Sequence, residues 1–323
     1  MNQGANTAEF PVTSVTYTDV DEAAAAVKGA DVEICQSGRG QYWANFLSVP
    51  LGTSHLQAMQ DRLATLTRGS VSRASCGFVL TVFGVPGVSA NGHELDGSRL
   101  VYYGPGAEAY AACRGPTMWV TFALPPAELH RAMSALAGAH WTPPAGESRL
   151  ICPERKVIKA LRETVAEALT LATKQPQVLA SEQVRADVHQ RLLTAFAQAM
   201  ASDGGGTVAR TQLSHARVIA RCEEYLRQHL DQPVYLIELC EAAGASERSL
   251  RDIFQEFYGM SPMRYLKVRR LNQIRRELMR ADPSRTNVTK IAMSLGVWEL
   301  GRFAGEYRAM FGETPSQTLR GQR

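Results

Sequence analysis

The sequence predicts an α+β protein with an N-terminal β-barrel and flanking helices, followed by an all-α domain of two helix-turn-helix motifs joined by a linker helix. Short β-branched and aromatic runs, ended by Gly or Pro, dominate residues 12–125 and predict the barrel or jelly roll. One pattern, with glycine, a polar turn, an apolar-periodic helix, aromatic-Gly and Ser/Thr-Pro, occurs twice near the C-terminus. Three consecutive glycines in residues 201–213 predict a flexible linker between domains 1–200 and 214–323.

Composition limits the classes of protein that this chain can belong to. Its 323 residues suggest two domains of ordinary size. No apolar run reaches the length of a membrane span, and the N-terminus lacks the basic and apolar regions of a signal peptide. The six cysteines are scattered without a C-x-x-C pair, which is typical of reduced thiols. We therefore expect a cytoplasmic protein without a membrane segment.

The N-terminal elements follow from local signals. Residues 76–88 and 117–125 are β-branched and aromatic runs, and Asn91-Gly92 is a strong hairpin signal. Apolar residues at helical spacing then predict three helices, over residues 126–138, 153–174 and 180–201.

No catalytic or metal-binding constellation is visible in this half. His55, His93, His130 and His140 are far apart and form no His-x-His pair, and there is no phosphate loop or G-x-S-x-G motif. The sequence therefore predicts no enzyme activity, no metal and no cofactor.

Arg68 and Arg73 are the candidate ligand-binding residues of the N-terminal domain. A pair of arginines beside a strand could hold an anion through bidentate hydrogen bonds. Their spacing is loosely similar to the arginine motif of cyclic-dinucleotide-binding barrels, but the Asp/Asn-x-Ser-x-x-Gly half of that motif is missing. Two solvated arginines in a loop is the alternative interpretation.

The first copy of the repeated pattern reads as a helix-turn-helix. A helix over residues 236–243 ends at Gly244, which can take a positive φ. Ser246 is placed to cap the next helix, and Leu250 and Phe254 form its inward face at i and i+4.

The second copy repeats these features with one extra residue in its turn. Gly296 corresponds to Gly244, and Phe303 and Tyr307 form the inward face of the following helix. The stretch 262–280 between the copies predicts a linker helix about 28 Å long. Adjacent major grooves on one face of DNA lie about 34 Å apart, so a helix of this length can set two recognition helices on successive turns.

At these residues the C-terminal region resembles the DNA-binding domain of the AraC/XylS family of bacterial transcription regulators. The resemblance covers residues 214–321, about a third of the chain, and rests on the signature Gly296, Phe303, Tyr307, Phe311, Gly312, Thr314, Pro315, Ser316 and Arg320. It implies that the N-terminal domain, often cupin-like in this family, senses an effector and forms dimers. The charge agrees, with 18 Lys+Arg against 13 Asp+Glu from residue 213 onward.

The resemblance also points to residues that contact DNA. Asp252 departs from it, because the family often has arginine there. Small apolar residues in the second recognition helix predict less base reading by that copy. The base-reading candidates are Arg248, Ser249, Arg251, Leu300, Arg302 and Ala304. The candidates for contacts to the DNA backbone are Arg269, Arg270, Arg275, Arg276, Lys290 and Arg308.

The resulting hypothesis is a sequence-specific transcription regulator, an activator, controlled by a small molecule bound in the N-terminal domain. Its expected partners are double-stranded DNA, RNA polymerase, a small-molecule effector and a second copy of the chain. The alternatives are a dimeric regulator that needs no ligand and a regulator whose N-terminal barrel binds a cyclic dinucleotide.

Overall fold

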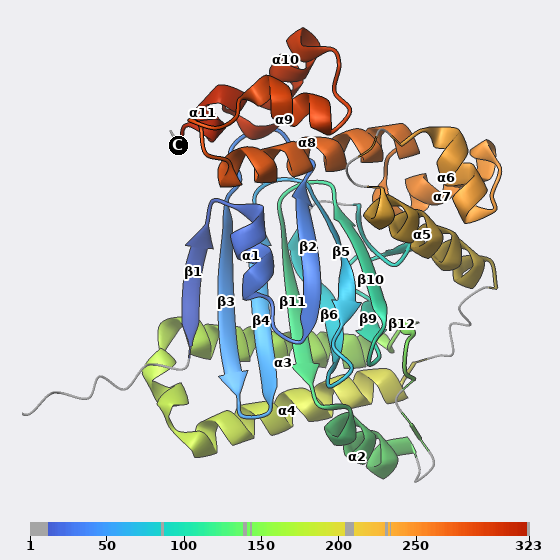
Figure 1. Ribbon diagram of the computed structural model, residues 1–323. Coiled ribbons are helices and arrows are strands. Elements are labelled where there is room, and N and C mark those ends of the chain that lie inside the picture. The colour runs from blue at the N-terminus through green and yellow to red at the C-terminus, as the bar shows by residue number, and fades with distance from the viewer. Residues whose placement is uncertain are drawn as a thin grey trace, which may run out of the picture.

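The computed structural model describes residues 12–84, 87–137, 141–142, 144–203, 210–229, 232 and 234–321. Two β-sheets form the N-terminal domain, and helices form the C-terminal domain that packs against it (Figure 1). The α+β fold class is confirmed. Within the described ranges, no helix is both long and apolar enough to cross a membrane.

The N-terminal domain contains one sheet of seven strands and one of five. Their orders are β1-β3-β4-β11-β6-β9-β12 and β2-β5-β10-β7-β8, and neighbouring strands are antiparallel. The strands are β1 (Thr13–Tyr17), β2 (Ala30–Gln36), β3 (Ala44–Leu51), β4 (Ser54–Asp61), β5 (Thr65–Val71), β6 (Cys76–Gly84), β7 (Val88–Ala90), β8 (His93–Glu94), β9 (Leu100–Tyr103), β10 (Glu108–Cys113), β11 (Thr117–Leu124) and β12 (Ser148–Ile151).

The sheets do not close into a barrel, so that part of the prediction is wrong. Strands β1 and β12 remain the edges of the larger sheet, and β2 and β8 the edges of the smaller one. The two sheets face each other as layers of a sandwich. Strand signals in the sequence locate strands but do not say which edges pair. The predicted hairpin is confirmed, because Asn91 and Gly92 join β7 to β8 with φ of 48° and 78°, as a type I′ turn requires.

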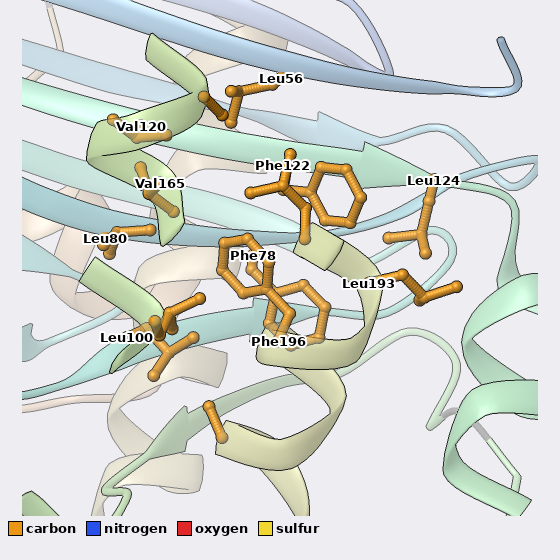
Figure 2. Close-up of a cluster of buried hydrophobic side chains, with 14 of the residues drawn as sticks. Leu56, Phe78, Leu80, Leu100, Val120, Phe122, Leu124, Val165, Leu193 and Phe196 are labelled. Carbon is orange, nitrogen blue, oxygen red and sulfur yellow. The ribbon is translucent and has the colours of Figure 1, made fainter. Parts of the chain in front are cut away.

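Helices cover the outer face of the larger sheet. Phe78 of β6 and Phe122 of β11 stack on Phe196, with ring centroids 4.8 and 5.2 Å apart (Figure 2). Leu161 and Val165 complete this core from the neighbouring helix. The three predicted helices are therefore confirmed. The helices of this domain are α1 (Val20–Ala26), α2 (Pro126–Ala137), α3 (Arg155–Lys174), the 3-10 helix η1 (Pro176–Ala180) and α4 (Glu182–Ala201).

The C-terminal domain consists of helices on a shared long helix, α8. Residues 204–209, most of the predicted linker, lie outside the described residues, so the domain boundary stays a prediction. The helices are α5 (Arg210–Gln228), α6 (Leu236–Ala243), α7 (Glu247–Tyr258), α8 (Pro262–Arg280), α9 (Val288–Ser294), α10 (Leu300–Phe311) and α11 (Pro315–Leu319).

One apolar core belongs to both domains. The face of the smaller sheet that points away from the larger sheet contributes Cys35, Leu66 and Tyr110, which pack with Phe254 and Phe257 of α7. Figure 1 shows α8 across the upper ends of the strands and α5 to α7 beside β10, so the smaller sheet contacts both the larger sheet and the C-terminal helices. The smaller sheet is therefore in direct contact with the first helix-turn-helix.

Candidate DNA interface

The first helix-turn-helix forms as predicted. Helix α6 ends at Gly244, whose φ of 63° is the left-handed conformation expected of a helix-ending glycine. The Ser246 hydroxyl accepts a hydrogen bond from the Ser249 amide at 3.2 Å and so caps α7. Leu250 and Phe254 are fully buried. The turn and the inward face of α7 therefore hold the opposite face outward.

The second helix-turn-helix repeats this construction. Gly296 has a φ of 75°, and Phe303 and Tyr307 form the buried inward face of α10. Ala292, a small residue four positions before the glycine, is also buried. Its cap differs, since Glu299 makes no side-chain capping bond to α10. The turn holds, but α10 begins without the side-chain acceptor that α7 has.

Helix α8 carries both units. Its 19 residues correspond to about 28 Å. Tyr265 and Val268 belong to the core of the first unit, whereas Leu271, Ile274 and Leu278 belong to that of the second. The predicted linker helix is confirmed, and its apolar residues are divided between the two motifs.

The base-reading candidates sit on the outer faces of the two recognition helices. Arg248 and Arg251 of α7 are exposed, and Arg251 forms an ion pair with Glu247 one turn earlier. On α10, Arg302 is exposed and donates to Glu306 at 2.9 Å. Ala304 is exposed, and Ser249 and Leu300 are half-buried. Nothing tests these candidates further, and they stay predictions.

Three of the six backbone candidates are already engaged in buried ion pairs. Arg269 pairs with Glu223, Arg275 with Glu313, and Arg276 with Asp21 and Glu33. Their side chains are only 7, 11 and 11% exposed. In this arrangement they bind protein carboxylates instead of DNA phosphates, which corrects the expectation for them. The other three remain accessible: Lys290 and Arg308 are exposed and Arg270 is half-buried.

The comparisons with known proteins concern this C-terminal region. The family described as "Helix-turn-helix domain" matches residues 239–321. The "Probable thc operon regulatory protein" of Rhodococcus erythropolis is 42% identical over 103 residues, which cover 32% of this chain and 31% of that protein. The "XylDLEGF operon transcriptional activator" of Pseudomonas putida is 38% identical over 100 residues, which cover 31% of each chain.

The C-terminal domain is an AraC/XylS-type helix-turn-helix domain. The chain spans about a third of the length of these two curated relatives, both of which are named as regulators and not as enzymes. A solved structure of a probable AraC family transcriptional regulator from Rhodopseudomonas palustris is 38% identical, covering 33% of this chain and 97% of that one, with a TM-score of 0.29.

Sequence reasoning missed a buried ion cluster between this AraC/XylS-type domain and the sheets. The Glu223 carboxylate of α5 accepts hydrogen bonds from Arg269 at 2.9 Å, from the Tyr258 hydroxyl at 3.0 Å and from the Tyr265 hydroxyl. Arg68 of β5 lies 3.4 Å from the same carboxylate. Glu223 sits within an apolar stripe of α5, and that was the only signal in the sequence.

Glu33 of β2 extends this cluster across the domain boundary. It pairs with Arg68 and Arg276, and Arg269 lies 3.9 Å away. Burial alone would raise the pKa of Glu33, but the positive charges of Arg276, Arg68 and Arg269 outweigh burial and lower it to about 2. The carboxylate is therefore held ionised by cations from both domains.

Backbone groups are joined across the same boundary. The Asn272 amide of α8 accepts from the Gln36 backbone N–H at 3.0 Å and donates to the Gln36 carbonyl at 2.8 Å. Asn272 therefore satisfies both backbone groups at the end of β2, as a neighbouring strand would. Both side chains are buried, at 1 and 2% exposure.

The two ligand candidates occupy different environments. Arg68 is committed to Glu33 and Glu223 on the face of the smaller sheet that packs on α5. Arg73 is exposed, in the turn before β6. Arg68 is thus not free to bind an anion in this arrangement, while the expectation for Arg73 stays a prediction.

Proposed function

We propose that the chain is a sequence-specific transcription activator that binds duplex DNA through both helix-turn-helix motifs, recruits RNA polymerase and acts as a homodimer in the cytoplasm. The observation that carries this proposal is the single helix α8, which holds both motifs in one rigid unit about 28 Å long. A linker helix of this length can set the separation of about 34 Å between two successive major grooves on one face of DNA.

In this proposal α7 provides most of the base reading. Arg248 and Arg251 extend from its exposed face. A guanidinium can donate to both major-groove acceptors of guanine, which contributes about 1–3 kcal/mol of discrimination against the other bases. On α10, Gly301 and Gly305 have open space where a side chain would be. We therefore expect α10 to contact the DNA backbone and thymine methyl groups more than the hydrogen-bonding edges of the bases.

The effector, in this proposal, binds between the two sheets. Residues in the middle of a sandwich normally become buried, yet Val79, Trp119 and Thr121 of the larger sheet are only half-buried on their inward side. Opposite them, Thr67 and Ala111 of the smaller sheet are half-buried as well. In this proposal these residues line the effector site, because hydroxyls, a tryptophan and small apolar groups suit a small, partly aromatic molecule.

The smaller sheet can pass a ligand signal to the DNA-binding domain. Thr67 faces the space between the sheets, whereas its neighbour Arg68 points the other way and pairs with Glu223. Ala111 and Tyr110 alternate in the same manner on β10. A ligand that shifts these strands would move the groups that hold α5, provided that it binds the two arrangements with different affinities.

The first test is to map binding of the purified protein on fragmented DNA from its own organism, with the Arg248→Ala/Arg251→Ala variant as control. A few sharp peaks that the variant loses are expected. Diffuse binding that the variant shares with the wild type would refute sequence-specific reading by α7.

The effector is tested separately with a panel of small molecules in a thermal-shift assay. A binder should raise the melting temperature of the wild type but not of Thr121→Trp, which would fill the space between the sheets. Thr53→Trp, in the exposed β3–β4 turn, serves as the control and should still respond. A flat panel together with a stable dimer would favour the regulator that needs no ligand. Binding of a cyclic dinucleotide that Arg73→Ala abolishes would favour the third hypothesis.

A further inference from the structure

A groove of about 1270 Å³ runs along α8 between the two helix-turn-helix motifs. Its floor is the face of α8 that carries Arg264, Lys267 and Arg270. Its walls come from the residues just before α6, from the turn before α10 and from one side of α10 itself. Two arginines of the N-terminal domain, Arg39 and Arg114, also line it.

The groove carries a large excess of positive charge. Six cations line it, Arg39, Arg114, Arg264, Lys267, Arg270 and Arg302, against the two carboxylates Glu299 and Glu306. Glu306 already binds Lys267 at 2.6 Å and Arg302 at 2.9 Å. Among the residues that the structure describes, no carboxylate lies within 4.0 Å of Arg39, Arg114, Arg264 or Arg270. These four guanidinium groups are therefore available to bind an anion from outside the chain.

The two N-terminal arginines are held in place beside the two motifs. Arg39 is exposed in the loop after β2, and the Gln36 side-chain amide fixes this loop by donating to the carbonyls of Gly38, Gly40 and Met310 at 3.0, 2.6 and 2.6 Å. The Gly40 amide also donates to the Met310 carbonyl at 2.9 Å. Because Met310 belongs to α10, the loop that carries Arg39 is anchored next to the second motif.

Arg114 has the corresponding place at the first motif. It is exposed in the turn between β10 and β11, and its guanidinium lies across Gly259, where any Cβ would collide with it. Gly259 ends α7 with a φ of 65°. The N-terminal domain thus presents one arginine beside each recognition helix, both at the rim of the same groove.

Duplex DNA is the anion that this geometry fits. A duplex whose successive major grooves receive α7 and α10 has one minor groove between them, and the phosphates on either side of it face α8. Resting on the proposed DNA-binding function, we propose that Arg39 and Arg114 bind those phosphates, so that the N-terminal domain adds to DNA affinity without reading sequence. The recognition helices would specify the site, and these arginines would strengthen binding equally at every site.

The test measures DNA binding by the full chain as a function of salt, using a mixed-sequence 40-base-pair duplex and a fragment from a mapped peak. Each lost phosphate contact lowers the slope of log K against log salt by about 0.9, which corresponds to roughly 8-fold in affinity near 0.1 M salt. Arg39→Ala/Arg114→Ala should therefore weaken binding up to about 60-fold on both duplexes and reduce the slope by about 2. Arg39→Lys/Arg114→Lys keeps the charges and should retain most of the slope, which separates lost contacts from misfolding.

A matched control removes two exposed arginines elsewhere. Arg131→Ala/Arg155→Ala changes the net charge equally, on helices α2 and α3 far from α8 (Figure 1), and should leave the slope unchanged. An unchanged slope in Arg39→Ala/Arg114→Ala would overturn the inference, as would tighter binding, which would mean that the loop obstructs the groove. If wild type binds but Arg248→Ala/Arg251→Ala loses no specificity, only the sequence-specific function fails. If wild type binds neither duplex, both proposals fail.

Discussion

Replacing Glu223 with glutamine tests the buried ion cluster most directly. The carboxylate is 2% exposed and faces Arg269, which is 7% exposed, together with two tyrosine hydroxyls. Glutamine has the same shape but no charge, and its NH₂ group would point at donors. Removing one partner of a buried ion pair costs about 3–5 kcal/mol, because the remaining charge stays buried.

We expect a loss near the lower end of that range, about 3 kcal/mol, or more than 100-fold in the unfolding equilibrium. Glu33 lies 3.9 Å from Arg269 and would keep part of its charge compensated. The measurement is urea unfolding followed by far-UV circular dichroism, comparing midpoints at an unchanged slope.

The next residue provides the control. Glu224 pairs with Arg227 at the surface, with side chains 50 and 53% exposed. Exposed pairs are worth about 0–1 kcal/mol, so Glu224→Gln should be close to wild type. If Glu223→Gln were as stable as Glu224→Gln, the cluster would not be a structural requirement and the reasoning would be wrong.

Three further predictions concern pH, glycine and capping. Because the pKa of Glu33 is lowered from 4.5 to about 2, its contribution is complete above pH 4.5 and is lost as the pH falls towards 2. Wild type should lose about 3 kcal/mol more than Glu33→Gln over that window in acid titrations of unfolding free energy; equal losses would contradict the assignment. Gly259→Ala should destabilise by at least about 1 kcal/mol in thermal melts, because of its positive φ and the guanidinium above it, whereas Gly301→Ala, in open helical space, should stabilise by about 0.5–1 kcal/mol. Ser246→Ala should cost about 1 kcal/mol through the lost cap of α7, and a rescue by Ser246→Asp would identify the cap as the cause.

Local rules predicted the parts of this chain that depend on neighbours in sequence. The glycine at each helix end and the Asn91-Gly92 turn need a positive φ that few residues adopt, and the serine cap needs a short side-chain acceptor. Such signals can be read directly. The pairing of strand edges cannot, because it depends on contacts between distant segments, and so the sandwich was taken for a barrel.

The same distinction explains the arginines of α8. Arg269 and Arg270 are adjacent in sequence and chemically identical, yet neighbouring residues leave a helix about 100° apart. One is therefore buried against Glu223 and the smaller sheet, and the other faces the groove between the motifs. The sequence predicted that both arginines contact the DNA backbone, because no pattern within α8 indicates which of its faces the N-terminal domain covers.

If the proposed effector control operates, helix α8 limits how the effector can act. Its apolar stripe is shared by the two motifs. Asn272 and Arg276 attach its second face to strand β2, and Arg269 on that face pairs with Glu223 of α5. The cations of its third face line the groove. The N-terminal domain does not cover the exposed arginines of α7, so an effector need not uncover them. Under the proposed ligand control, an effector would instead change the attachment of β2 to α8, and with it the position of the loop that carries Arg39 relative to the second motif.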